Sequence, residues 1–244
     1  MPGTRLSTCS RGRRSICRRR TGCGSGEPVP RPRQMRVLIV GASGGTGRAL
    51  VQQALARGDA VTALVRNAAR LPIADPSLTV VLGDVMKPET LDAAVRGQDA
   101  VLSALGHKQW FYPTRILSIG TQNLIDAMRR HGVRRLIVET ALGVGDAWWQ
   151  MGLYYTLFVK VFILPFYFFD KGRQEALVRV SGLDWTLVRP GALNNGPRRG
   201  VYRQGPRVGH WLRTVRVSRA DVAAFMLDQV TDHRYVGSAV GIAN

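Results

Sequence analysis

A glycine pattern that follows a short apolar run constrains the fold of this chain more than any other feature. The run Arg36–Val40 is apolar after its first residue, which is typical of a strand buried on both faces. Gly41, Gly44 and Gly47 follow it, and a helical pattern begins at about residue 45. Glycine is needed where a chain turns tightly or where its backbone lies close to another group. The pattern therefore predicts a strand, a tight turn and a helix.

The same turn predicts a nucleotide site. A helix N-terminus presents unpaired N–H groups and a partial positive charge, which suit a pyrophosphate. Between a strand and a helix, this glycine spacing is typical of dinucleotide binding. We expect the phosphates to contact the loop residues Gly41, Ser43, Gly44, Gly45, Thr46 and Gly47. The alternative interpretation is a flexible turn without a ligand.

Strand and helix patterns alternate along the rest of the chain. The expected strands cover residues 36–40, 60–65, 79–82, 100–103, 133–139 and 184–188, with a short last strand at 240–243. The expected helices cover about 45–57, 113–130, 165–181 and 218–230, with a short one after residue 87. Such βα units predict the α/β class: a single doubly wound Rossmann domain with a mainly parallel sheet. Ligands of such sheets bind at the carboxyl ends of the strands.

Residues 1–34 differ in composition from the remainder. They hold nine arginines, one acid and all three cysteines, and show no apolar periodicity. We expect a disordered basic tail, followed by a folded domain over residues 35–244. The tail fits an organelle transit peptide, a nucleic-acid-binding arm or a mis-called start, and the last is favoured because Met35 precedes the first strand. The expected location is cytoplasmic, unless the tail is a transit peptide.

Composition of the domain bears on its partners. Residues 35–244 carry 26 basic and 15 acidic side chains, which favours anionic ligands but also fits loose binding of nucleic acid or a membrane surface. We expect no specific nucleic-acid partner. Because no cysteine lies in the domain, no disulfide or thiolate metal site forms there, and no metal site is predicted.

The residues after the second expected strand indicate which dinucleotide is bound. NAD-binding proteins usually place an acid there for the ribose 2′-hydroxyl, whereas an arginine suits the 2′-phosphate of NADP. Here Arg66 stands at this position, and no acid is present. Its guanidinium would hold the phosphate with two hydrogen bonds. NADP(H) is the preferred cofactor and NAD(H) the alternative, while a solvated surface arginine is the other interpretation of Arg66.

Three further positions belong to the predicted cofactor site. Asp84 and Val85 follow the third expected strand, where the adenine would lie. The Asp84 carboxylate either accepts from the adenine amino group or caps a turn. Small residues at the end of the fourth expected strand leave room for the cofactor ribose, and the positions there are Ser103, Leu105 and Gly106.

Several motifs together resemble a known family. They cover residues 41–47, 64–66, 83–85, 97–101 and 181–191, and the last includes Pro190, which we add to the cofactor site. Together they resemble atypical short-chain dehydrogenase/reductases, in particular the NAD(P)H-binding branch with biliverdin-IXβ/flavin reductases and NmrA-like proteins. The resemblance extends over about residues 35–244. It implies a Rossmann sheet and NADPH-dependent reduction, although some members only sense the cofactor.

Short-chain reductases use a Tyr-x-x-x-Lys pair for proton transfer. Tyr167 and Lys171 have this spacing, which puts both on one helix face. The lysine charge lowers the phenol pKa, so the tyrosine exchanges a proton with a carbonyl oxygen as hydride moves. Thr140, after the fifth expected strand, completes the set. The alternative interpretation is that Tyr167 is apolar wall, Lys171 pairs with Glu175 and Thr140 is a strand-end hydroxyl. His107 is another candidate proton donor, although a surface histidine is favoured there.

An aromatic segment at residues 147–169 lies between two expected strands. It approaches the length of a membrane span, but Lys160, Pro165 and its place within one sheet argue against a span. A lid or dimer face is favoured, and docking to a membrane surface is the alternative. A lid of this composition predicts a large, flat, apolar or aromatic substrate. The expected state is a monomer or a homodimer.

The basic last third of the chain and the predicted cofactor site bear on the function. Arginines are frequent in residues 198–219, where a solvated surface is favoured over attraction of an anionic substrate. We expect an NADPH-dependent oxidoreductase that transfers hydride to a carbonyl, flavin, quinone or similar conjugated acceptor. The alternatives are a non-catalytic NADP(H)-binding sensor of the NmrA-like type and a membrane- or quinone-associated chaperone-like relative.

Overall fold

A computed structural model describes residues 34–106, 113–145, 150–152, 157 and 165–244. Residues 34–244 form one compact unit. The predicted disordered tail lies outside the described residues, apart from Gln34. His107 and most of the predicted lid segment also lie outside them, so the lid stays a prediction.

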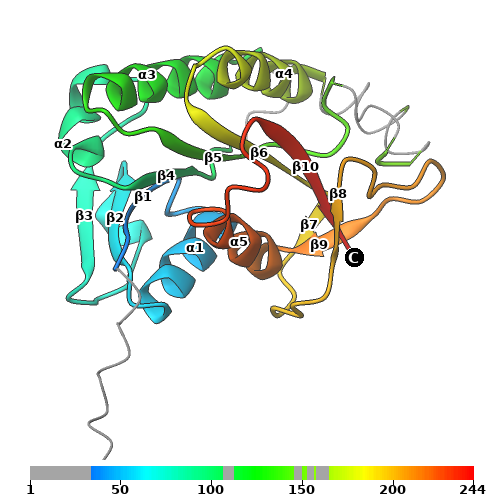
Figure 1. Ribbon diagram of the computed structural model, residues 1–244, viewed down its shortest axis with the longest axis horizontal. Coiled ribbons are helices and arrows are strands. Elements are labelled where there is room, and N and C mark those ends of the chain that lie inside the picture. Colours follow the sequence, from blue (N-terminus) through cyan, green and yellow to red (C-terminus); the bar gives the residue numbers. More distant parts are fainter. Residues whose placement is uncertain (1–33, 107–112, 146–149, 153–156, 158–164) are drawn as a thin grey trace, which may run out of the picture. The chain divides into compact units, whose positions relative to one another are not determined.

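The main sheet of the described chain has eight strands in the order β3-β2-β1-β4-β5-β6-β10-β8 (Figure 1). Their bounds are β1 Arg36–Val40, β2 Ala60–Val65, β3 Leu78–Leu82, β4 Ala100–Ser103, β5 Arg135–Glu139, β6 Asp184–Pro190, β8 Arg203–Gly205 and β10 Ser238–Ala243. All neighbours are parallel except β10 and β8. This confirms the predicted doubly wound, mainly parallel sheet. Its order reverses between β1 and β4, so the loops after these strands form the crevice in which such folds bind ligands.

Helices cover both faces of the sheet (Figure 1). Helices α1 and α5 pack together on one face, and α3 and α4 pack together on the other. The helices are α1 Gly45–Ala56, α2 Asp92–Val95, α3 Ile116–Arg130, α4 Pro165–Arg179 and α5 Arg219–Asp228, with 3₁₀ turns η1 Ala68–Arg70 and η2 Pro88–Thr90. None of the helices in the described part of the chain combines the length and the apolar character needed to cross a membrane.

Strand β1 shows why the sheet is buried on both faces. Val37 and Ile39 belong to the core beneath α1 and α5, whereas Leu38 and Val40 belong to the core beneath α3. Successive side chains of a strand point to opposite faces, so an apolar run supplies both cores at once. The apolar run read from the sequence is therefore a central strand.

A second, two-stranded sheet was not predicted. It pairs β7 (Ala192–Asn194) with β9 (Arg216–Ser218) in parallel, and β9 leads directly into α5. The Ser218 hydroxyl caps that helix, because it accepts from the Asp221 backbone N–H at 3.0 Å. Strands of three residues that contain arginine and asparagine carry no alternating apolar pattern, which is the signal a sequence offers.

Candidate functional site

The loop between β1 and α1 has a backbone reason for its glycines. Gly41 has a φ of 82°, and a Cβ there would lie 2.6 Å from the carbonyl oxygen of Ala104. A Cβ on Gly47 would overlap the carbonyl oxygen of Gly41. The Gly44 N–H donates to that same oxygen at 2.9 Å. The loop is therefore folded tightly on itself and against the chain after β4, as the glycine pattern predicts.

The N-terminus of α1 is open to a ligand. No side chain caps it, and Gly44 and Gly45 are exposed. The first backbone N–H groups of a helix have no partner within the helix, so they are available to an anion. The Thr46 hydroxyl donates to Glu139 at 3.0 Å, so its proton is not available to a phosphate.

An arginine from α5 lies over this loop. A Cβ on Gly45 would lie 2.6 Å from Cδ and 2.7 Å from Nε of Arg219. The Arg219 guanidinium also donates to Asn195 Oδ1 at 2.6 Å. A positive charge therefore stands beside the open helix N-terminus. Sequence reasoning placed Arg219 only among the basic residues of the last third, because nothing local links it to a loop 174 residues earlier.

Three arginines gather after β2. Arg66 is exposed directly after the strand, and the Arg48 guanidinium of α1 donates to the Arg70 carbonyl oxygen at 2.9 Å. The turn between them is held by Asn67, whose Oδ1 accepts from the Ala69 N–H at 2.9 Å. Residues 60–74 contain no acid. This end of the crevice is therefore cationic.

The predicted adenine contacts lie in a turn after β3. Asp84 Oδ1 accepts from the Met86 N–H at 3.0 Å, which corresponds to the turn-capping interpretation. Val85 is buried, and its carbonyl oxygen accepts from Asn123 of α3 at 2.8 Å. A contact of Asp84 with adenine stays a prediction.

Lys171 links the ends of two central strands. It is buried on α4, and its Nζ donates to the carbonyl oxygens of Glu139 at 2.8 Å and Leu105 at 3.2 Å. Its Nζ lies 5.8 Å from the ring centroid of Tyr167, which is half-buried one turn earlier. Burial lowers the Lys171 pKa to about 8, although nearby carboxylates, that of Glu139 foremost, favour the charged form.

Glu139 is a site residue that sequence reasoning missed. It ends β5, it is buried, and its carboxylate accepts from Thr46 of α1. Burial raises its pKa, against the opposing effects of the Lys171 charge, the Thr46 hydrogen bond and Arg219. The carboxylate therefore connects the glycine loop with the α4 lysine. An acid at the end of an otherwise apolar strand was the available signal.

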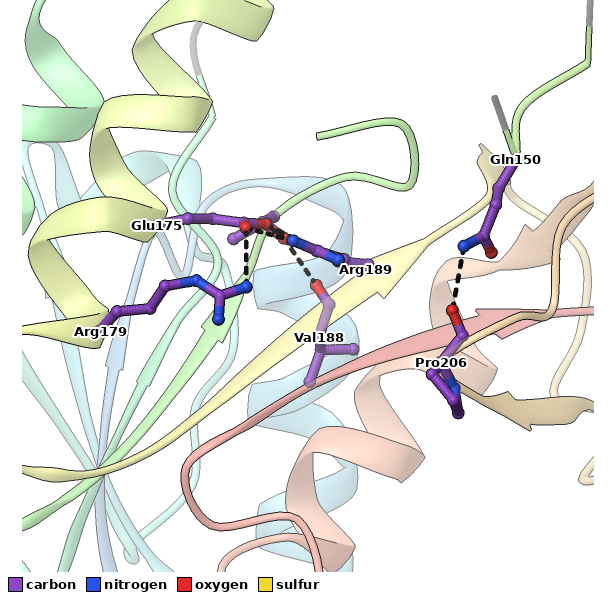
Figure 2. A network of polar contacts seen from close by, with 7 residues as sticks. Gln150, Glu175, Arg179, Val188, Arg189 and Pro206 are labelled. Carbon is purple, nitrogen blue, oxygen red and sulfur yellow. Dashed lines mark hydrogen bonds and ion pairs between the residues drawn. The ribbon is translucent and has the colours of Figure 1, made fainter. Parts of the chain in front are cut away.

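A second buried network surrounds Thr140. The Thr140 hydroxyl donates to Glu175 Oε1 at 2.8 Å. Glu175 forms a two-point ion pair with Arg189 at 3.0 and 2.6 Å, and Arg179 lies 3.8 Å from its Oε2 (Figure 2). Glu175 thus pairs with Arg189, and not with Lys171. Since a hydroxyl has one proton, Thr140 in this arrangement would contact a substrate only as an acceptor.

The remaining predicted cofactor residues lie at the same edge of the sheet. Ser103 ends β4, is fully buried, and its Oγ has no hydrogen-bond partner among the described residues. Gly106 follows as an exposed residue. Pro190 ends β6, and its carbonyl oxygen accepts from the Leu142 N–H at 2.9 Å. Within the described ranges, no cluster of three or more His, Cys, Asp or Glu side chains is arranged to hold a metal ion.

The lowered pKa of Lys171 predicts how stability changes with pH. Between pH 8 and 10.5, the unfolded chain holds the Lys171 proton and the folded chain does not. Stability therefore rises with pH in this window, by at most about 1.4 kcal/mol per pH unit for this one proton. The Lys171→Met variant has no ionisable group at this position, so its stability should not show this rise between pH 8 and 10.5. Urea unfolding of both proteins across the window measures the difference, and a difference independent of pH would show that Lys171 titrates normally.

Comparisons with known proteins agree with this geometry. A family model described as NAD(P)H-binding matches residues 41–233. A chloroplastic protein of Arabidopsis thaliana, itself uncharacterised, is 35% identical over 184 residues, which are 72% of this chain and 65% of that protein. A photosystem II assembly factor of Synechocystis is 27% identical over 224 residues, which are 84% of this chain and 63% of that protein. The chain thus spans less than two thirds of the length of either relative.

A solved structure shares the fold. The short-chain dehydrogenase/reductase of Veillonella parvula, in complex with NADP, superposes with a TM-score of 0.73 at 20% sequence identity. The superposition covers 86% of this chain and 94% of that chain. At this identity the likeness shows the fold alone.

Proposed function

The chain belongs to the NAD(P)H-binding family, and from this premise we propose that it is an NADPH-dependent oxidoreductase that transfers hydride to a carbonyl, flavin, quinone or similar conjugated acceptor. Family membership confirms the resemblance inferred from the sequence motifs. The observation that supports the proposal is that buried Lys171 donates to the carbonyl oxygens of Leu105 and Glu139, at the ends of two central strands, and lies 5.8 Å from the Tyr167 ring centroid. The substrate is a small molecule.

The residues present fit a dinucleotide. The loop from Gly41 to Gly47 leaves no room for side chains on its inner side, and the helix behind it offers free N–H groups. Arg219 adds a charge at the same place, suited to a pyrophosphate. The buried Ser103 hydroxyl, which has no partner among the described residues, would bond the cofactor ribose. When bound, NADPH supplies the hydride from its nicotinamide ring.

Arg66 is proposed to select NADPH over NADH. Replacing it in the Arg66→Gln variant should remove a charge-assisted bond to the 2′-phosphate, worth about 1.5–3 kcal/mol, and so weaken NADPH binding about 10- to 100-fold. NADH affinity should stay unchanged. Titrations with both cofactors measure this, and Arg96→Gln, an equal charge change at another exposed arginine, is the control. An equal loss for both cofactors in Arg66→Gln would contradict the assignment.

The proton step is assigned to the α4 pair. The Tyr167 hydroxyl donates the proton to the acceptor oxygen or nitrogen, and the Lys171 charge stabilises the phenolate that remains. Because its ammonium is bound to two backbone carbonyl oxygens, Lys171 acts through its charge and stays in place. The Thr140 hydroxyl would have to turn away from Glu175 to donate to the acceptor oxygen, so in the observed arrangement it takes no part in the proton step. Glu175 sets the orientation of that hydroxyl.

Turnover tests the proposal. Purified protein should oxidise NADPH with at least one class of acceptor among flavins, quinones and aldehydes. Tyr167→Phe should lower kcat about 100- to 10,000-fold, the usual contribution of a general acid, and leave the Kd for NADPH unchanged. No oxidation above background with any acceptor, despite tight NADPH binding, would contradict the reductase. Full activity of Tyr167→Phe would contradict the role of this tyrosine.

A second candidate function is a non-catalytic NADP(H)-responsive binding protein. It is favoured by the similarity to a photosystem II assembly factor of Synechocystis. Pull-downs at high and low NADPH/NADP ratios should then recover a partner in only one condition.

Membrane-surface association through residues 147–169 is tested by liposome flotation. The chloroplastic relative keeps an organelle as the alternative to the predicted cytoplasmic location.

A further inference from the structure

A cavity of about 560 Å³ lies among the short strands of the last third of the chain. Its lining is strongly basic. It includes His210 and four arginines, namely Arg199, Arg203, Arg213 and Arg216. No acidic side chain lines it among the described residues. The side chains of Asn194, Thr214 and Asn244 add neutral polar groups, and Asn244, as the last residue of the sequence, also carries a backbone carboxylate.

One wall of the cavity is held by Gln150, far away in the sequence. The Gln150 side chain donates to the Pro206 carbonyl oxygen at 3.0 Å (Figure 2). It also accepts from the Gly209 N–H at 3.3 Å. Its backbone oxygen accepts from the His210 N–H at 3.1 Å. A Cβ on Gly209 would overlap that same oxygen. This wall is therefore built before any ligand arrives.

His210 is oriented within the wall. Its Nδ1 accepts from the backbone N–H groups of Leu212 at 3.1 Å and Arg213 at 3.2 Å. A ring nitrogen that accepts carries no proton, so the other nitrogen, Nε2, is the donor. His210 thus adds a hydrogen-bond donor to the arginines around the cavity.

The acid nearest in sequence to the cavity is already engaged. Asp221 is fully buried, and its Oδ1 accepts from the backbone N–H groups of Arg199 and Gly200, both at 2.9 Å. Its Oδ2 accepts from the Ser218 hydroxyl at 2.7 Å. Within the part of the chain that the structure describes, none of the four cavity guanidinium groups forms an ion pair or a side-chain hydrogen bond. All four residues are exposed, so water and salt screen part of their mutual repulsion, and a bound anion would reduce it further.

The cavity adjoins the dinucleotide loop. Asn194 and Ser218, which both line it, are paired in register between β7 and β9. The residues that follow them, Asn195 and Arg219, are hydrogen-bonded to each other, and the Arg219 side chain lies against Gly45. One step along each short strand therefore leads from the cavity to the glycine loop.

We propose that this cavity binds a small molecule carrying two or more phosphate or carboxylate groups, as a ligand other than the dinucleotide. Arginine is suited to both groups, because its planar fork matches their oxygen pairs.

Calorimetric titration tests the site. Inorganic pyrophosphate and citrate are titrated separately into the full chain saturated with NADP⁺, which occupies the loop. We expect saturable binding of at least one of these probes. The variant Arg203→Ala/Arg213→Ala should bind it at least about tenfold more weakly. Arg198→Ala/Arg207→Ala is the matched control, because it removes two exposed charges from the same segments outside the cavity lining, and it should lose less than about threefold.

The outcomes separate the two proposals. No saturable binding of either probe, or an equal loss in both double variants, would overturn the anion site. Binding of pyrophosphate but not citrate, or the reverse, supports the site and identifies its ligand class. NADP⁺ affinity is measured in parallel and should be the same in all three proteins. If NADP⁺ does not bind, the proposed function fails, and the same comparison of double variants without NADP⁺ still decides the anion site.

Discussion

Replacing Gly47 with alanine should weaken NADPH binding by about 100-fold or more, in a protein that still folds. A Cβ at this position would overlap the Gly41 carbonyl oxygen and lie 2.8 Å from the Ala42 Cα. The loop must move to accommodate the added Cβ. Its backbone N–H groups then no longer point toward the expected phosphate positions. Loss of two charge-assisted bonds, each worth about 1.5–3 kcal/mol, accounts for the effect.

The control for this variant is Gly172→Ala. Gly172 lies within α4 and a Cβ there meets no atom within 4 Å, so alanine should leave NADPH affinity unchanged and stabilise the helix by about 0.5–1 kcal/mol. Fluorescence titration with NADPH and a thermal melt measure both properties. Unchanged affinity in Gly47→Ala would mean that the phosphates do not lie on this loop.

The Glu175→Gln variant should lose about 3–5 kcal/mol of unfolding free energy. Glu175 and Arg189 are each only 4% exposed and are joined at 2.6 Å, so removing the carboxylate leaves a buried guanidinium without its counter-charge. Glutamine has nearly the same volume, which separates the effect of charge from that of packing. Urea unfolding followed by circular dichroism measures the loss.

An exposed ion pair supplies the comparison. Arg234 and Asp232 lie 3.7 Å apart with side chains 67% and 38% exposed, so Arg234→Gln should change stability by less than about 1 kcal/mol. A loss of under about 1 kcal/mol in Glu175→Gln as well would contradict the account of the network as a buried structural support for Thr140.

Much of the fold follows from local sequence signals. The strands at residues 36–40, 60–65 and 100–103 match their predicted bounds, because an apolar run ends at a glycine or a polar residue in each. The helix expected from residue 113 begins at Ile116, since proline fixes only the approach to a helix start. The strands β7, β8 and β9 were missed because three residues show no periodicity.

In the candidate site, too, features set by neighbouring residues were predicted, and features that depend on distant residues were not. The tight glycine loop was predicted because it directly follows the strand that positions it, whereas the cofactor role of Arg66, after the next strand, stays a prediction. Glu139 and Arg219 were missed because their roles depend on neighbours far along the chain: Glu139 contacts Thr46, 93 residues earlier, and Arg219 lies against Gly45. Such contacts follow from the strand order, which a single sequence does not reveal.

Equilibrium titration of the full chain with NADPH and with NADH tests the central claim most directly, namely that the crevice between the glycine loop and Arg66 holds NADP(H). The fluorescence of the reduced nicotinamide reports binding of either cofactor. We expect saturable binding of NADPH, at least about tenfold tighter than that of NADH, because only NADPH carries the 2′-phosphate that Arg66 is proposed to bind. Absence of saturable binding of both, or tighter binding of NADH, would contradict the central claim.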